Sequence, residues 1–161
     1  MNEASLTEQS FDVVICGGGM AGLTLALQLR QTQPERSVAV IEPTTRPLPD
    51  GAHKVGESSV ELGSIYLRRL GLRDYLRDQH IIKLALRFFP GGGHLPLEQR
   101  DELGPARQPL MVSYQMDRGK LENDLRDMIV EAGATLIEGA NVTAIELTEG
   151  EAPHTVTITG E

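Results

Sequence analysis

Three glycines and one acid form the most informative pattern in this chain. Gly17, Gly19 and Gly22 follow directly on the apolar run 11–16, and Glu42 lies twenty positions beyond the last of them. A strand that turns in this way into a helix presents backbone N–H groups to the pyrophosphate of a dinucleotide. An acid at the end of the next strand accepts hydrogen bonds from the adenosine ribose, which favours FAD or NAD over NADP. The pattern predicts a dinucleotide site at Gly17, Gly19, Met20, Ala21, Gly22 and Glu42.

Each of the three glycines has its own physical reason. Gly17 permits the tight turn after the strand, and Gly19 lets bare backbone approach the phosphates. Gly22 lets the helix close against the strand without a Cβ between them. The alternative is a glycine turn that binds nothing. The register of strand, turn, helix, second strand and acid favours the ligand site.

Composition limits the class of protein. The 161 residues correspond to about one domain, and a formal net charge of −8 argues against nucleic acid or an anionic membrane as the main partner. The four histidines are scattered and there is one cysteine, so no metal site is predicted. No apolar run approaches the roughly 20 residues of a membrane span. The sequence therefore predicts a soluble, cytoplasmic protein, with residues 1–10 as a short disordered N-terminus.

Hydrophobic periodicity predicts the elements around the glycine turn. We expect a helix over 20–33, a second strand over 37–41 and a long loop over 43–56. Ser58 and Glu61 resemble a capping box for a following helix, which Gly71 can end. A short helix over 74–78 follows it.

The second half of the chain alternates strands and loops around one helix. The run 81–89 alternates apolar and other residues, which predicts a strand with Lys83 and Arg87 on one face. Asp117 is expected to cap a helix that ends at Gly133. The remaining elements are a loop or irregular hairpin over 90–109 and strands over 110–116, 134–137, 142–147 and 155–159, the last two forming a hairpin.

These elements predict an α/β fold with a parallel sheet. The parallel candidates start near Phe11, Ser37 and Ala134, which is fewer strands than a doubly wound sheet normally has. We therefore expect either an incomplete domain or a second chain that supplies the rest of the fold, and no catalysis by this chain alone. Residues 11–161 are assigned to one FAD-binding domain, in which 81–116 is an insertion on the substrate side.

Nearly the whole chain, 11–159, resembles the N-terminal part of the FAD-dependent monooxygenase superfamily, and within it the tryptophan-halogenase-like flavin-dependent halogenases. Besides the glycine motif with Glu42, two segments carry the resemblance. Residues 54–59 resemble the Gly-Glu-Ser/Ala-Thr signature of halogenases, and 114–122 resemble the segment in which an arginine at a helix start meets FAD. The resemblance implies FAD as cofactor and a Rossmann-like three-layer fold of the glutathione-reductase type.

The resemblance also implies further cofactor-binding residues. In the family the Gly-Glu segment runs beside the isoalloxazine ring, which places Gly56, Glu57 and Ser58 near the flavin. The alternative is that Glu57 and Ser58 only cap a helix. Arg118 is implied to reach the ribityl or phosphate region, and Val142 to pass beside the adenine.

Lys83 matches the essential lysine that halogenases carry on the strand after the Gly-Glu helix. In the family, reduced FAD, oxygen and halide yield hypohalous acid. The lysine hydrogen-bonds this oxidant or forms a haloamine with it before an electron-rich aromatic metabolite is halogenated. A separate flavin reductase supplies the reduced FAD. The alternative is a solvated lysine on a half-exposed strand.

The chain departs from the halogenase pattern in places. Val60 and Glu61 stand where halogenases often have Val/Leu-Pro, and the Trp-x-Trp-x-Ile-Pro and distal Gly-Asp motifs are absent; in a full-length member both would lie beyond residue 161. Three other functions stay open. They are an FAD-dependent hydroxylase or reductase in which Lys83 is incidental, a noncatalytic FAD-binding module that needs a partner chain, and, last, an NAD-dependent dehydrogenase.

Overall fold

The computed structural model describes residues 8–107 and 110–160. The described residues divide into two compact units: unit 1 contains those up to Lys54 and from Arg118 onward, and unit 2 contains those between Val55 and Asp117. Most of the predicted disordered N-terminus, and residues 108–109 of the predicted loop, lie outside the described residues.

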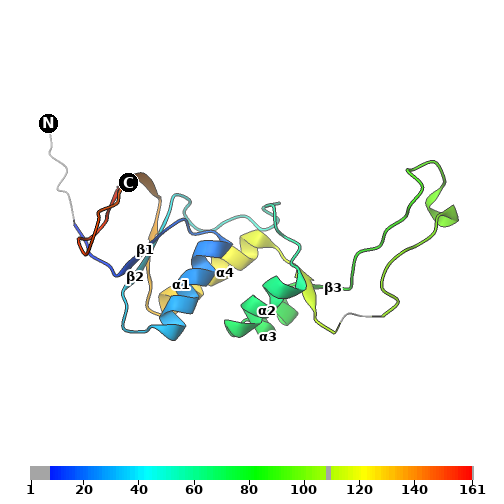
Figure 1. Ribbon diagram of the computed structural model, residues 1–161, viewed down its shortest axis with the longest axis horizontal. Coiled ribbons are helices and arrows are strands. Elements are labelled where there is room, and N and C mark those ends of the chain that lie inside the picture. Colours follow the sequence, from blue (N-terminus) through cyan, green and yellow to red (C-terminus); the bar gives the residue numbers. More distant parts are fainter. Residues whose placement is uncertain (1–7, 108–109, 161) are drawn as a thin grey trace. The chain divides into compact units, whose positions relative to one another are not determined.

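Unit 1 contains a parallel sheet of three strands in the order β1-β2-β5 (Figure 1). The strands are β1 (Val13–Cys16), β2 (Val38–Glu42) and β5 (Thr135–Glu138), with Val13 opposite Val38 and Ala39 opposite Thr135. The four apolar residues of the central strand β2 are all buried, as a parallel sheet with covered faces requires. The predicted α/β class and the three parallel strands are confirmed.

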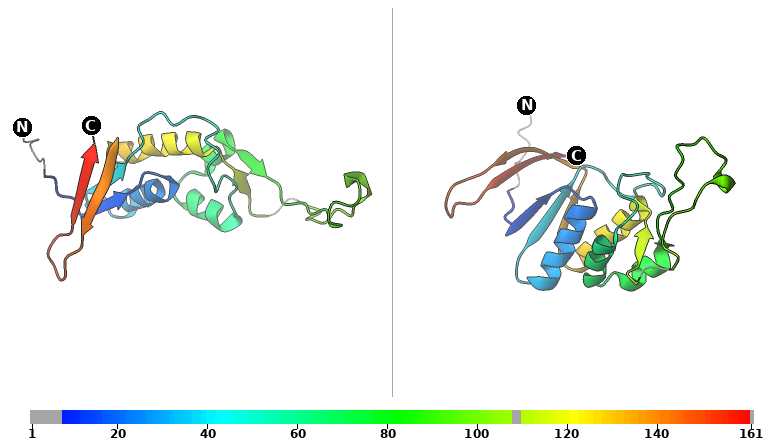
Figure 2. Two further views of the ribbon diagram at one scale, coloured as in Figure 1. Left: turned by 90° about the horizontal axis from the view of Figure 1, so that it is seen from above. Right: turned by 45° about the vertical axis from the view of Figure 1, so that its right-hand side comes forward.

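Two helices of unit 1 lie side by side, as Figures 1 and 2 show. They are α1 (Met20–Thr32) and α4 (Arg118–Glu131). Leucines and isoleucine at helical spacing give each helix one buried stripe, because residues four apart share a face. The fully buried apolar positions are Leu23 and Ala26 on α1, and Leu121, Leu125 and Ile129 on α4.

An antiparallel hairpin completes unit 1 and is seen in orange and red in Figure 2. It consists of β6 (Ala140–Glu146) and β7 (Thr155–Gly160), with a register shift between Val142 and Ala144. The predicted hairpin is confirmed. None of the helices among the described residues combines the length and the apolar character needed to cross a membrane.

Unit 2 is built around two short helices and a two-stranded antiparallel sheet. The elements are α2 (Glu61–Arg69), α3 (Arg73–Gln79), β3 (Ile81–Lys83), a 3₁₀ turn (Leu97–Gln99) and β4 (Ser113–Gln115). The buried apolar side chains of this unit are Leu67, Leu70, Leu72, Leu76, Tyr114 and Met116.

The predicted strand over 81–89 is too long. The observed strand ends at Lys83, because its partner β4 has only three residues and the ladder stops with it. Beyond that point the backbone forms only an isolated bridge between Phe88 and Leu103. Lys83 and Arg87 therefore do not share the face of one strand.

The predicted capping box at Ser58 is also wrong. α2 begins at Glu61, its N-cap residue is Val60, and no side chain caps it. Ser58 instead forms a β-bridge with Gln115, and this extended backbone holds it away from the first turn of the helix. The Ser58 hydroxyl is thereby available to another partner, described below.

Candidate functional site

The glycine turn has the tight geometry that its sequence predicts. Gly17 has φ of +122°, which glycine adopts without strain, and its N–H donates to the Ile41 carbonyl at 2.8 Å. A Cβ at Gly22 would lie 2.0 Å from the Gly17 carbonyl oxygen. Only glycine at position 22 therefore allows α1 to begin this close to the end of β1.

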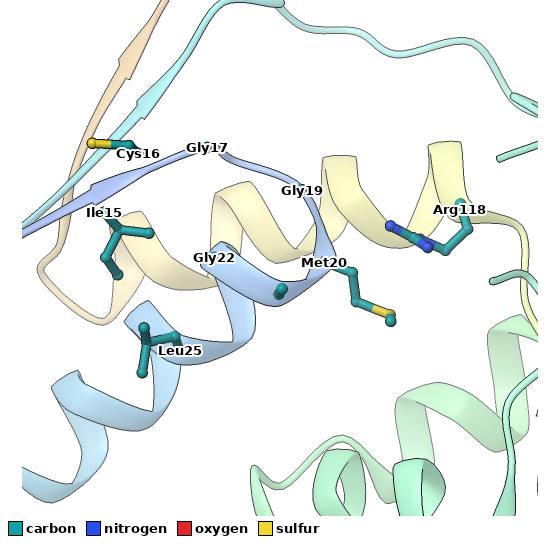
Figure 3. Close-up of a pocket in the computed structure, with 9 residues that line it drawn as sticks. Ile15, Cys16, Gly17, Gly19, Met20, Gly22, Leu25 and Arg118 are labelled. Carbon is teal, nitrogen blue, oxygen red and sulfur yellow. The ribbon is translucent and has the colours of Figure 1, made fainter. Parts of the chain in front are cut away.

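A cavity of about 500 Å³ opens beside this turn. It is lined by the end of β1, the turn, the first part of α1 and one residue of α4: Ile15, Cys16, Gly17, Gly19, Met20, Ala21, Gly22, Leu25 and Arg118. In Figure 3 the Arg118 side chain reaches from the start of α4 toward Met20 at the N-terminus of α1. A helix N-terminus and a guanidinium side by side favour an anion, and phosphate in particular.

Glu42 lies at the carboxyl end of β2, next to the turn. Its Oε2 accepts the Gly18 N–H at 2.7 Å, and its Oε1 accepts the Thr44 N–H at 3.0 Å. A Cβ at Gly18 would come within 2.8 Å of the Glu42 Cβ, so this position also requires glycine. Gly18 was not among the residues predicted for this site, although the unbroken Gly17–Gly19 run was a signal for it.

A second acid, Glu122, is fully buried at the N-terminus of α1. Its Oε1 accepts the Met20 N–H at 3.3 Å and two N–H groups of Arg118, from Nη2 at 2.5 Å and Nε at 3.1 Å. Its Oε2 accepts the Lys54 ammonium at 2.5 Å. Burial raises the pKa of Glu122, but the hydrogen bonds from Lys54 and Arg118 outweigh it and hold the pKa below the ordinary value.

Glu122 and Lys54 were not among the site residues predicted from the sequence. Both lie inside segments that it singled out, and the i, i+4 spacing of Arg118 and Glu122 was a signal for an ion pair. Val142 lies on β6 opposite Ile158, at the register shift, and is not among the residues that line the cavity.

In unit 2 the Gly-Glu segment and Lys83 lie together. The Lys83 ammonium donates to the Ser58 Oγ at 3.0 Å and to the Ser59 carbonyl at 2.6 Å. Gly56 has φ of +92°, and the Glu57 carbonyl accepts the Met116 N–H at 2.6 Å. The ammonium group of Lys83 thus connects β3 to Ser58, which lies 25 positions earlier in the chain.

The buried side chain of Ser59 fixes this arrangement. Its Oγ accepts the Tyr114 N–H at 2.7 Å and lies 3.0 Å from the Ser64 Oγ, while its N–H donates to the Tyr114 carbonyl at 2.8 Å. These bonds attach the segment before α2 to β4, which in turn pairs with β3. The position of Lys83 relative to Ser58 is therefore set by the Ser59 hydroxyl together with backbone pairing.

Comparison with known proteins gives consistent matches. Residues 12–47 match the model of the FAD binding domain family. The flavin-dependent halogenase chlA of Dictyostelium discoideum is 34% identical over 142 residues, which cover 80% of this chain and 23% of that protein. The chain is thus similar to part of a flavin-dependent halogenase. It spans about a quarter of the length of this curated relative.

Solved structures show the same fold. The myxobacterial chondrochloren halogenase CndH matches with a TM-score of 0.74 at 24% identity, over 95% of this chain and 34% of that one. A flavoprotein/dehydrogenase from Cytophaga hutchinsonii matches with a TM-score of 0.69 at 21% identity, over 92% and 35%. The fold is thus the FAD-binding α/β fold implied by the sequence resemblance, and FAD is the cofactor of the family.

Proposed function

We propose that the protein to which this chain belongs is a flavin-dependent halogenase that acts on an electron-rich aromatic metabolite with reduced FAD, oxygen and halide. The single observation that carries the proposal is the contact of Lys83 with Ser58 and Ser59. It joins the proposed lysine to the Gly-Glu segment, in a chain 34% identical to a flavin-dependent halogenase.

The residues around the glycine turn fit FAD. Backbone at the turn, the N-terminus of α1 and the Arg118 guanidinium offer donors to its phosphates, and Glu42 offers carboxylate oxygens to the adenosine ribose. The residues proposed to hold FAD are Gly17, Gly19, Met20, Ala21, Gly22, Glu42 and Arg118, with Gly56, Glu57 and Ser58 beside the flavin ring and Val142 beside the adenine. When bound and reduced, FAD supplies with oxygen the oxidising chemistry that converts halide to hypohalous acid.

Lys83 is the proposed catalytic residue. Of its three ammonium N–H groups, one donates to the Ser58 hydroxyl and one to the Ser59 carbonyl, which fixes the nitrogen in place. An N–H directed at the oxygen of hypohalous acid would draw electron density toward that oxygen and leave the halogen more electrophilic. The aromatic carbon then takes the halogen, the O–halogen bond breaks, and the proton lost from the ring ends on the oxygen as water. In the alternative mechanism, Lys83 would form a haloamine with hypohalous acid, and the haloamine would transfer the halogen to the aromatic carbon.

The rest of the proposed reaction depends on partners. A flavin reductase would deliver the reduced FAD, and the small-molecule substrate and the halide would meet at Lys83. A second chain, or further sequence, would supply the remainder of the fold. Residues 81–116 are proposed to face the substrate, in keeping with the exposed apolar side chains Leu84, Leu86 and Phe88.

The test uses full-length protein with reduced FAD and bromide or chloride. We expect the wild type to release FAD on denaturation, as identified by chromatography, and to form halogenated product. Lys83→Ala should lower the rate by about 100-fold or more while keeping its FAD. Lys120→Ala, in unit 1, is the control and should keep the full rate.

A second candidate is an FAD-dependent hydroxylase or reductase, favoured by the fold match to a flavoprotein/dehydrogenase. In that case product forms without halide and Lys83→Ala is as active as the wild type. FAD binding without any turnover, restored by another chain, would instead favour the noncatalytic module.

A further inference from the structure

A fully buried carboxylate beside a site for phosphate needs an explanation. Glu122 lies where the N-terminus of α1 and the Arg118 guanidinium meet, and both of these groups attract anions. A negative charge at this point repels a phosphate, and burying it costs free energy unless it is well paired. A hydrophobic residue at position 122 would avoid both costs.

The contacts of Glu122 indicate what it provides. Its Oε1 accepts both the Nε and the Nη2 of Arg118, so the planar guanidinium is held at two of its nitrogens. An arginine side chain otherwise has several rotatable bonds, and fixing them at the moment of ligand binding costs conformational entropy. The same oxygen accepts the Met20 N–H, which ties the guanidinium to the first residue of α1.

The charge of Glu122 is offset inside the protein. Lys54 donates to Oε2 at 2.5 Å, so the cluster of Glu122, Arg118 and Lys54 carries one net positive charge. Both carboxylate oxygens are turned toward donors of the protein. The repulsion that an incoming phosphate meets is therefore reduced.

We propose that Glu122 is a positioning residue, which holds the Arg118 guanidinium beside the N-terminus of α1 in the orientation that the phosphates of FAD require. This inference rests on the proposed placement of the FAD phosphates at the glycine turn. It adds a residue that touches no cofactor atom and acts through Arg118. The fixed orientation of the Arg118 guanidinium raises FAD affinity by more than the negative charge of Glu122 lowers it.

A double-mutant cycle in FAD affinity tests the proposal. FAD is titrated into the cofactor-free full-length protein, and its fluorescence reports binding by the wild type, Glu122→Gln, Arg118→Met and the double variant. Because Glu122 acts through Arg118, Glu122→Gln should weaken FAD binding about tenfold in the wild-type background. In the Arg118→Met background it should change the affinity by less than about twofold.

Three outcomes would overturn the proposal. An equal loss in both backgrounds would mean that Glu122 only stabilises the fold. Tighter FAD binding by Glu122→Gln would mean that the carboxylate competes with the phosphates. An unchanged affinity would mean that Arg118 needs no such support. Asp124→Asn is the matched control, because it removes one negative charge from the same helix at a side chain that pairs with Lys120.

A second variant keeps the test open if Glu122→Gln does not fold. Arg118→Lys keeps the charge but lacks the fork that Glu122 holds at Nε and Nη2. We expect its FAD affinity to stay within about threefold of that of Arg118→Met. Recovery to the wild-type affinity would show that charge alone suffices and would contradict the proposal.

The same titration separates this inference from the proposed function. If the wild type binds no FAD, or if Gly22→Ala binds it normally, the placement of FAD at the glycine turn fails. If the wild type binds FAD at the turn and the cycle is additive, only the role of Glu122 fails. The halide assay on Lys83→Ala bears on neither of these.

Discussion

The two proposed functional cations of this chain are held in opposite ways. Arg118 of unit 1 is paired with the buried carboxylate of Glu122 and is only 11% exposed. Lys83 of unit 2 is held by a hydroxyl and a backbone carbonyl, and the described residues place no acid within ion-pair distance of it. The charge of Arg118 is thus offset by a carboxylate, whereas Lys83 is held only by neutral oxygen atoms.

This difference matches the two ligands proposed for these sites. A dinucleotide makes many contacts with its site, so Arg118 contributes more by orienting the phosphates than by its charge. A halide or hypohalous acid is a small group with few contacts, and an uncompensated ammonium gives it a stronger partner.

Of the variants below, Gly22→Ala should change its measured property most. That property is FAD affinity at the glycine turn, beside Arg118. The new Cβ would lie 2.0 Å from the Gly17 carbonyl oxygen, so the turn must open or α1 must shift. We expect FAD affinity to fall by about 100-fold or more, measured by FAD titration. Gly63→Ala is the control, since a Cβ there meets nothing within 4 Å and alanine favours the helix by up to about 1 kcal/mol. FAD bound as tightly by Gly22→Ala as by the wild type would contradict the geometry of the turn.

Ser58→Ala tests how Lys83 is held. The variant removes one of the two acceptors of the ammonium group and leaves the Ser59 carbonyl. We expect halogenation to slow about tenfold, less than for Lys83→Ala, because one hydrogen bond still directs the nitrogen. The assay is the rate of product formation at saturating halide, with FAD content measured in parallel. A loss of FAD with no change in rate per bound FAD would mean that Ser58 serves the cofactor only.

Lys54→Met tests the charge balance around Glu122. The Lys54 side chain is 40% exposed, so water screens part of its interaction with the buried carboxylate. We expect the free energy of unfolding to fall by about 1 kcal/mol, as determined by chemical denaturation. Lys120→Met removes a similarly exposed lysine from a pair 3.5 Å apart, and should change it by less than about 0.5 kcal/mol. Equal losses in the two variants would indicate that Glu122 does not depend on Lys54.

The smallest effect is expected in the pH dependence of stability. The pKa of Glu122 is lowered in the folded protein from an ordinary value of 4.5, so the unfolded chain takes up this proton first on acidification. The stabilisation is complete above about pH 4.5 and is lost as the pH falls through the folded pKa below that value. Below pH 4.5 the wild type should therefore lose stability more steeply than Glu122→Gln, in denaturation curves taken between pH 6 and 3. Parallel curves would mean that Glu122 has the same pKa in both states.

Local sequence patterns were sufficient to predict the helices and strands of unit 1. The apolar spacing of α1 and α4, the buried run of β2 and the glycine turn are each determined by residues close in the chain. The strand over 81–89 was wrong because alternation shows a face but not a partner, and β4 ends after three residues. Ser58 was misassigned for a similar reason, since its bridge to Gln115 joins residues far apart in sequence.

The site of Arg118 was predicted only in part. Its glycines follow a spacing rule, but the ion pair between Lys54 and Glu122 joins residues 68 positions apart. No local pattern reports such a contact. The role of Gly18 likewise depends on Glu42, which approaches it across the sheet.

Cys16 gives the cavity a chemical label of its own. It is the single cysteine among the 161 residues, it is exposed, and it lies at the end of β1 next to Gly17, where it lines the cavity. An alkylating reagent would therefore mark this chain at one position, identifiable by mass spectrometry of the peptide. The rate of marking with and without FAD would be a covalent footprint of occupancy that requires neither turnover nor knowledge of the substrate.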